Sequence, residues 1–280
     1  TNYTDLVSLM PNVLGKKLPV IIKKFGAVSL VGNTQLTTTS IHANLTSKTA
    51  LGAVTAKFTI NDMDQSDQAA YKGYVVLHDF NIGNLLDNKS LSKVSLDLDV
   101  DGKGFSEKYL DTSLKGNVSH FAYNGYDYKN IAINGNFKLP IYKGSIIVND
   151  PNLKMNFDGL VNLSKKESQY DFQIKVDNAE LHKLNFVSDS ISQFNGEAIV
   201  DVQGNSIENL HGNIYINNAT YINPKSTYQF NDFNLNSSFD EKRIRTIKIS
   251  APDITNGTIV GNFKFAELNG LIANSLGSLY

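Results

Sequence analysis

The chain has 280 residues, with 26 Lys and Arg residues against 27 Asp and Glu residues, and it has no cysteine. Balanced charge argues against a nucleic-acid-binding surface, which needs clustered basic residues. A chain without cysteine has neither disulfides nor a thiolate metal site. It contains no run of about 18 apolar residues, so we expect no membrane-spanning helix within it.

The first residues suggest where the chain comes from. It begins at Thr1, without Met and without a signal peptide, so we expect it to be a piece of a longer protein. The lack of cysteine fits a bacterial envelope compartment, although cytosolic proteins can lack cysteine too.

Residues 1–27 are predicted to form a short helical lead-in. The one helical candidate runs from Asp5 to Phe25. It follows Thr4, a residue type favoured at helix N-caps, and Leu6 and Leu9 share a face of the helix.

Between residues 28 and 268 the dominant pattern is strict alternation of apolar and polar residues. In the segment 170–177, Tyr170, Phe172, Ile174 and Val176 fall on one side and polar residues on the other. This period of two predicts strands with one apolar and one polar face. Asn, Asp, Gly and Pro residues punctuate the pattern into about sixteen strands. Fifteen ranges can be drawn: Val28–Thr34, Ile41–Ser47, Ala53–Ile60, Gly73–His78, Val94–Val100, Leu114–His120, Ile131–Leu139, Ser145–Asn149, Phe157–Leu163, Tyr170–Val176, Ala198–Val202, Gly212–Asn217, Gln229–Leu235, Ile244–Ser250 and Thr258–Phe265.

The strand pattern predicts an all-β fold. Long helical crossovers are absent, which argues against a doubly wound parallel sheet. We find no linker and no break in composition, so we expect one continuous antiparallel sheet with more than half of the residues in strands. Residues 269–280 are predicted to form a tail.

The strand array also shows an internal repeat of about 100 residues. Five pairs of segments match in the same order, at offsets between 96 and 102 residues. Such order indicates a repeat architecture, although any array of amphipathic strands resembles itself to some degree. The pairs are Tyr71–Leu85 with Tyr170–Leu184, Asp99–Gly102 with Asp201–Gly204, Leu114–Val118 with Leu210–Ile214, Tyr126–Ile131 with Tyr228–Phe233, and Pro151–Leu153 with Pro252–Ile254.

Catalytic and metal-binding motifs are not evident. Asp97, Asp99, Asp101 and Gly102 mimic the start of an EF-hand calcium loop, but the twelfth position, which needs Glu, is Lys108. The three Asp residues alternate with apolar residues, so we expect a solvent-facing strand. The five histidines lack metal-ligand spacing. There is also no nucleophile elbow and no phosphate-binding glycine loop. We therefore predict that the chain is not an enzyme and needs no cofactor or metal.

Several segments resemble the central part of the TamB (translocation and assembly module) family, which belongs with the AsmA-like bridge-type lipid-transfer proteins. The resemblance covers roughly Pro19 to Phe265 and consists of repeat texture rather than catalytic signatures. It rests on Phe80–Leu86, Val94–Gly104, Gly125–Gly135, Asn149–Leu153 and Phe157–Gly159.

The resemblance implies a U-shaped, taco-like β-sheet trough that crosses the periplasm and carries phospholipid from the inner to the outer membrane. It also implies an inner-membrane anchor outside this chain, an outer-membrane barrel partner of the TamA or BamA type, and a role in outer-membrane biogenesis and protein assembly. Phospholipid acyl chains would lie on the apolar floor. We predict that the lining of this groove includes Val75, Leu77, Leu96, Leu98, Ile131, Ile133, Phe137, Phe172, Ile174, Val176, Ile259 and Phe263.

Two other interpretations remain open at the level of sequence. A structural β-sandwich or adhesin, with its apolar face closed on itself and no lipid cargo, presents the same alternation. The second alternative interpretation is a module that binds a small ligand. What covers the apolar face, protein or lipid, distinguishes these interpretations.

Overall fold

In the part of the chain that the structure describes, sixteen strands follow one another and form a single antiparallel sheet. The computed structural model describes residues 24–63, 65, 67–105, 108–252 and 255–264. Strands make up 67% of these residues, so the prediction of a chain that is more than half strand is confirmed for them. The predicted helix before Phe25 lies almost entirely outside the described residues, and the predicted tail lies wholly outside them.

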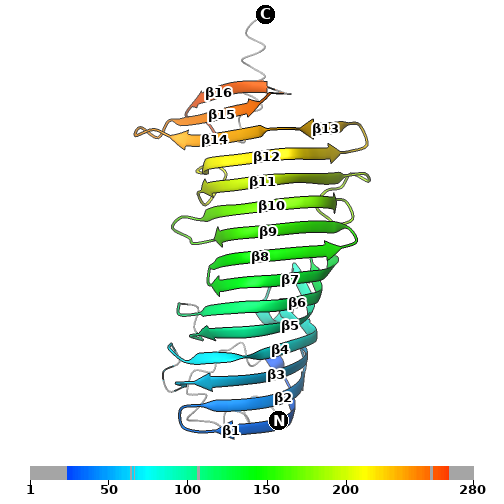
Figure 1. The fold of residues 1–280 in the computed structure, drawn as a ribbon, viewed down its shortest axis with the longest axis vertical. Helices are drawn as coiled ribbons and strands as arrows, with labels where there is room; N and C mark the ends of the chain where they lie inside the picture. The colour runs from blue at the N-terminus through cyan, green and yellow to red at the C-terminus, as the bar shows by residue number, and fades with distance from the viewer. Residues whose placement is uncertain (1–23, 64, 66, 106–107, 253–254, 265–280) are drawn as a thin grey trace, which may run out of the picture.

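The strands pair in sequence order from β1 to β12 and then through β14, β15 and β16, while β13 pairs with β12 beside β14. The strands lie roughly perpendicular to the long axis of the molecule (Figure 1). Their bounds are β1 Ser29–Leu36, β2 Ile41–Thr49, β3 Gly52–Asn61, β4 Ala70–Asn81, β5 Leu91–Lys103, β6 Asp111–Tyr123, β7 Tyr126–Lys138, β8 Ile141–Asp150, β9 Leu153–Asn162, β10 Gln169–Glu180, β11 Gln193–Gln203, β12 His211–Ile222, β13 Thr227–Phe230, β14 Phe233–Phe239, β15 Arg245–Ala251 and β16 Thr255–Gly261.

Each predicted strand range overlaps an observed strand, and many observed strands are longer. The range Thr258–Phe265 instead extends past the end of β16 at Gly261. β10 continues to Glu180, beyond the predicted end at Val176, because a β-bulge after Val176 shifts the alternation without ending the pairing. The range predicted as Gln229–Leu235 is two strands, β13 and β14. Asp232, between them, has a φ of 54°, which interrupts extended backbone.

One short helix, α2 (Ile82–Leu86), was not expected from the sequence. The side chain of Asn81 caps its start by accepting a hydrogen bond from the Asn84 N–H at 2.8 Å. Asp87 ends it in the left-handed conformation. Five residues are too few to show helical periodicity, so only these capping residues could have indicated the helix.

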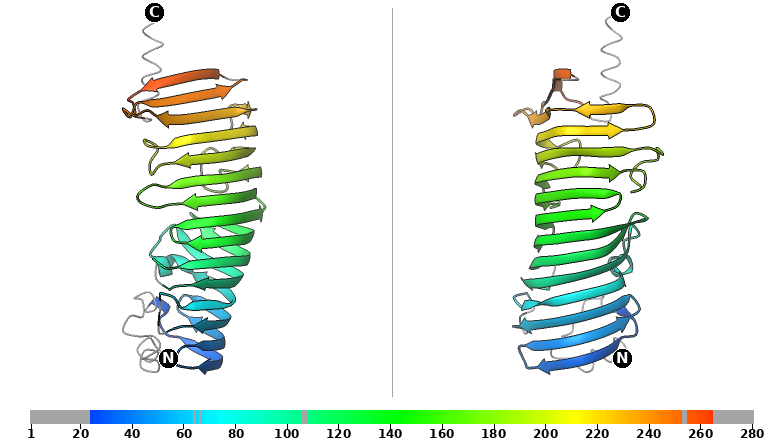
Figure 2. Two further views of the ribbon diagram at one scale, coloured as in Figure 1. Left: turned by 60° about the vertical axis from the view of Figure 1, so that its left-hand side comes forward. Right: turned by 45° about the vertical axis from the view of Figure 1, so that its right-hand side comes forward.

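The sheet is a single layer within the described residues. Extensive contacts join only strands that pair in the sheet, apart from those between α2 and β5. The two views of Figure 2 likewise show no second layer of strands over the sheet. The described residues therefore do not form the β-sandwich that was one interpretation of the sequence.

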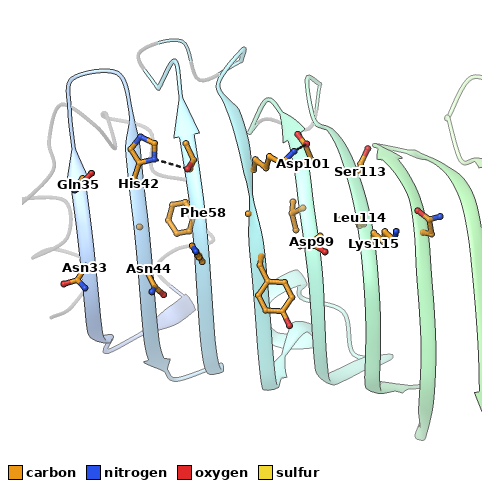
Figure 3. Close-up of a pocket in the computed structure, with 18 residues that line it drawn as sticks. Asn33, Gln35, His42, Asn44, Phe58, Asp99, Asp101, Ser113, Leu114 and Lys115 are labelled. Carbon is orange, nitrogen blue, oxygen red and sulfur yellow. Dashed lines mark hydrogen bonds and ion pairs between the residues drawn. The ribbon is translucent and has the colours of Figure 1, made fainter.

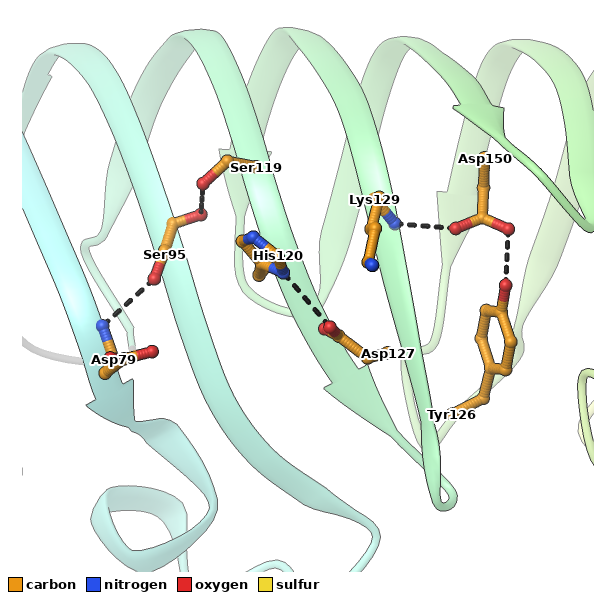
Figure 4. Close-up of polar contacts among 8 residues, drawn as sticks. All are labelled: Asp79, Ser95, Ser119, His120, Tyr126, Asp127, Lys129 and Asp150. Carbon is orange, nitrogen blue, oxygen red and sulfur yellow. Dashed lines mark hydrogen bonds and ion pairs between the residues drawn. The ribbon is translucent and has the colours of Figure 1, made fainter.

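The strands in the middle of the chain bend near one end (Figure 4). The ladder is irregular at these bends, for example between Leu77 and Phe80 in β4. Polar side chains satisfy backbone groups there. Ser95 Oγ accepts a hydrogen bond from the Asp79 N–H at 3.0 Å, and the Ser119 hydroxyl donates to the Ser95 carbonyl at 3.2 Å. Bulges increase local bending and twist, and these side chains compensate the backbone for the lost ladder bonds.

Some local features recur about 100 residues apart. The bulge after Leu77 in β4 has a counterpart after Val176 in β10, 99 residues later. The buried Phe80 likewise has its counterpart in the buried Ala179. These positions carry the same offset as the segments Tyr71–Leu85 and Tyr170–Leu184.

Candidate functional site

The residues of one sheet face form continuous apolar rows across the strands. Residues that are paired across strands project to the same face. The pairing therefore connects ten strands through one row, which we use to define the apolar face: Val75, Leu98, Gly116, Ile133, Ile146, Phe157, Ile174, Ala198, Ile216 and Phe233.

The register places eleven of the twelve predicted groove residues on this apolar face. Val75, Leu98, Ile133 and Ile174 belong to the defining row, and the others lie in parallel rows two or four residues away along their strands: Leu77, Leu96, Ile131, Val176, Phe172, Phe137 and Ile259. The twelfth residue, Phe263, follows β16, and its ring centroid lies 6.0 Å from the guanidinium carbon of Arg245.

Most of these side chains are only half-buried. Leu98, Ile131 and Val176 are buried, whereas the other nine retain part of their surface exposed. A residue in a closed core is covered from above by a second layer. Ile131 and Val176 belong to the main buried cluster of the sheet. Ile133 and Ile174 pack against this cluster and keep part of their surface exposed.

Aromatic rings lie above a row of glycines near the middle of this face. A Cβ atom at Gly135 would come within 2.9 Å of the Tyr142 ring, and one at Gly159 within 2.6 Å of Phe172 Cβ. The ring centroids of Phe157 and Phe172 lie 5.2 Å apart. Burial raises the pKa of the Tyr142 phenol. The glycines thus let aromatic rings lie close to the backbone, as seen where aromatic residues cover sheet glycines.

A closed core covers one end of the middle strands. Leu184 is 0% exposed and Phe80 and Val94 are each 3% exposed. Leu85, from α2, and Phe25 pack against this core. The core anchors that end of the sheet, and the rest of the apolar face extends away from it.

The apolar face is hollowed near its opposite margin. A pocket of about 400 Å³ is lined by Tyr170 and Phe172 of β10, by Val200 and Val202 of β11, and by the connection to β12, which includes Leu210. Its lining is mainly aromatic and aliphatic, as expected of a site for an apolar group.

Arg245 is a site residue that the sequence did not reveal. It begins β15 on the apolar face and is only 2% exposed. Its guanidinium carbon lies 4.7 Å from the Phe239 ring centroid, and Nη2 donates to the carbonyls of Ile207 and Glu208. Burial lowers its pKa. The only signal in the sequence is that Arg245 shares the alternating face of Ile247.

The opposite side of the sheet, the polar face, carries the calcium-loop mimic. Asp99 and Asp101 are exposed, as predicted, and Asp101 forms an ion pair with Lys72 at 2.8 Å. Asp97 is half-buried and accepts a hydrogen bond from the Asn117 N–H at 3.2 Å. Among the described residues, no three His, Asp or Glu side chains are grouped to hold a metal ion.

The polar face is also hollowed, over β1 to β7. This concavity encloses about 850 Å³, and Figure 3 shows polar side chains from successive strands pointing into it, among them His42, Asp99 and Lys115. No pattern in the sequence indicated a concave surface on this side. Its shape depends on how the whole sheet curves, which the alternation does not encode.

Comparison with known protein families, with curated proteins and with solved structures finds no match to this chain. No helix within the described residues has the length and apolar character needed to cross a membrane.

Proposed function

We propose that this chain is a segment of a lipid-transfer bridge and that phospholipid acyl chains bind along its apolar face. The observation that supports this proposal best is the combination of continuous apolar rows with a single-layer sheet. An extended apolar surface in a soluble setting usually marks an interaction site.

The energetics favour acyl chains as the occupant. Each methylene group that leaves water contributes about 0.8 kcal/mol, and a chain lying along the rows also completes the burial of side chains such as Ile133 and Ile174. The polar headgroup can remain in water at the margin of the sheet. Movement along the rows then requires no specific headgroup site and no chemical step, so we propose neither a catalytic residue nor a cofactor.

We further propose that the bends seen in Figure 4 belong to a U-shaped trough whose inner wall is the apolar face. Bulges in several strands, such as those after Leu77 in β4 and Val176 in β10, add local curvature to the sheet. A curved face surrounds an acyl chain on more sides than a flat face does, and so removes more of its surface from water.

The cellular setting that we propose follows from the resemblance to the TamB family. The full protein would be anchored in the inner membrane by a segment outside this chain and would extend through the periplasm. It would meet an outer-membrane barrel of the TamA or BamA type and would contribute to outer-membrane biogenesis and protein assembly.

Photo-crosslinking tests the lipid-binding face directly. A photoreactive residue at position 133 or 174, on the apolar face, should capture phospholipid in cells. The same residue at Asn134 or Lys175, the next position in each strand, should capture little because it faces the opposite side. Capture confined to positions 134 and 175 would mean that lipid binds the polar face, and capture at no position would favour a structural role without cargo.

A charge on the apolar rows tests transport. Ile174→Asp should block passage because an unpaired carboxylate on an apolar track is strongly disfavoured, whereas Lys175→Asp should leave passage intact. Lipid transfer between vesicles, measured with the full-length protein, reports the difference. Equal transfer by both variants, each with an unchanged melting temperature, would contradict the proposed track.

A further inference from the structure

The concavity on the polar face contains a continuous row of seven side chains, one from each strand of β1 to β7. Cross-strand pairing places them next to one another in the order Asn33, Asn44, Lys57, Tyr74, Asp99, Lys115 and Asn134. All seven line the concavity. Because strands lie about 4.8 Å apart, the row is roughly 29 Å long and runs perpendicular to the strands. A surface of this shape suits a linear ligand.

The central groups of this row are not used by the fold. Within the described residues, the side chains of Lys57, Tyr74, Asp99 and Lys115 form no hydrogen bond and no ion pair. Polar side chains beside them do: Lys72 pairs with Asp101 at 2.8 Å, and His42 contacts Thr59 at 3.0 Å. Tyr74 is 42% exposed, in the middle of the row. An exposed aromatic ring flanked by unused ammonium and carboxylate groups is a set of contacts available to a ligand.

We propose that this row binds a linear glycan. The Tyr74 ring offers an apolar plane for the C–H face of a sugar ring, and its hydroxyl stays available for hydrogen bonding. Carboxamide, carboxylate and ammonium groups on either side can donate to and accept from sugar hydroxyls. The site lies on the face opposite the proposed lipid track, so this inference is independent of the proposed function.

The charges and the backbone argue against other linear polymers. The concavity holds three lysines against two aspartates, far from the clustered positive charge that binding to a phosphate backbone requires. The strands beneath Lys57 to Lys115 are interior strands whose backbone groups already pair with neighbours on both sides. A peptide therefore cannot join them as an added strand, which is possible only at a sheet edge.

The experiment titrates the full chain with cellohexaose and chitohexaose, which are neutral, and with hexagalacturonate, which is acidic, and measures affinity by calorimetry. We expect the neutral hexasaccharides to bind. Tyr74→Ala should weaken that binding about tenfold, the loss of about 1.4 kcal/mol expected for an aromatic contact. Tyr74→Phe should retain most of the affinity. Tyr228→Ala is the matched control, because Tyr228 is 45% exposed but belongs to β13, outside the concavity.

Three outcomes would overturn the proposal. The first is no heat of binding from any neutral hexasaccharide at millimolar concentration. The second is binding that Tyr74→Ala leaves unchanged. The third is binding of hexagalacturonate alone that disappears at about 1 M salt, where the Debye length is about 3 Å, since this would show a general cationic patch. Tyr74 is exposed, so an unchanged melting temperature can verify that each variant is folded.

Discussion

The single-layer sheet predicts that two apolar truncations of equal size will differ greatly in their effect on stability. Leu184→Ala and Ile174→Ala each remove three carbon atoms. Leu184 is 0% exposed inside the closed core at one end of the sheet, whereas Ile174 is half-buried on the apolar face. The first truncation leaves an enclosed cavity, and the second widens a surface that is already open.

The magnitudes follow from this difference in burial. Three buried carbons correspond to about 2.4 kcal/mol of transfer free energy. For Leu184→Ala a cavity term adds to this, giving a loss of about 3–4 kcal/mol. For Ile174→Ala only part of the transfer term applies and no enclosed cavity forms, so we expect about 1 kcal/mol. The gap of about 2 kcal/mol corresponds to roughly 4–8 °C in melting temperature for a chain of this size.

Thermal melts followed by circular dichroism, on protein from which lipid has been extracted, measure the two losses. Similar losses of about 3 kcal/mol would refute the reasoning, because Ile174 would then be enclosed under a second layer. Repeating the melts with added lipid gives a control. A ligand that binds only the folded state raises the melting temperature, and Ile174→Ala should reduce that rise more than Leu184→Ala does.

Three further predictions concern backbone, pH and association. Gly144→Ala should destabilise the fold by more than about 1 kcal/mol in chemical denaturation, because the added Cβ would lie 2.3 Å from a neighbouring backbone atom. Gly257→Ala is the control and should be neutral, because its added Cβ would have no atom within 4 Å. Burial, together with the hydrogen bond to Asp150, raises the pKa of Tyr126 to about 12 from 10.0. The folded state therefore favours the neutral phenol, so the contribution of this phenol to stability should be constant below pH 10 and fall between pH 10 and 12; a Tyr126→Phe variant with the same alkaline loss would contradict this. Within the described residues, β1 and β16 are the two edges of the sheet and are largely exposed, so the isolated chain should associate end to end in sedimentation experiments. A lysine at Val31, which is 71% exposed, should reduce that association, and a monomer at high concentration would show that both edges are protected.

Local patterning explains why the strands were predictable. The alternation in the segment from Tyr170 to Val176 needs no tertiary information, because successive side chains of any strand point to opposite faces. The ends of the strands were harder to predict. The bulge after Val176 shifts the alternation by an extra residue, so the pattern appears to stop although the pairing continues to Glu180. The capping residues Asn81 and Asp87 were the only local signs of α2.

The apolar face was predictable residue by residue for the same reason. Ile133 and Ile174 are connected by three strand pairings in one row. Each alternates with its neighbours in its own strand, so the sequence alone assigned them to one side. Arg245 was missed because its burial depends on Phe239 and on carbonyls about 37 residues earlier in the chain. Contacts of that kind leave no periodic signal.

Alternation along single strands was enough to predict a sheet, to assign residues to a shared face, and to show that one face is apolar. The single layer, the bends at bulges in several strands and the hollow of the polar face around Tyr74 became visible only in the folded chain. These features arise from pairing and curvature accumulated over many strands. A pattern of period two is the same for a closed sandwich and for an open sheet.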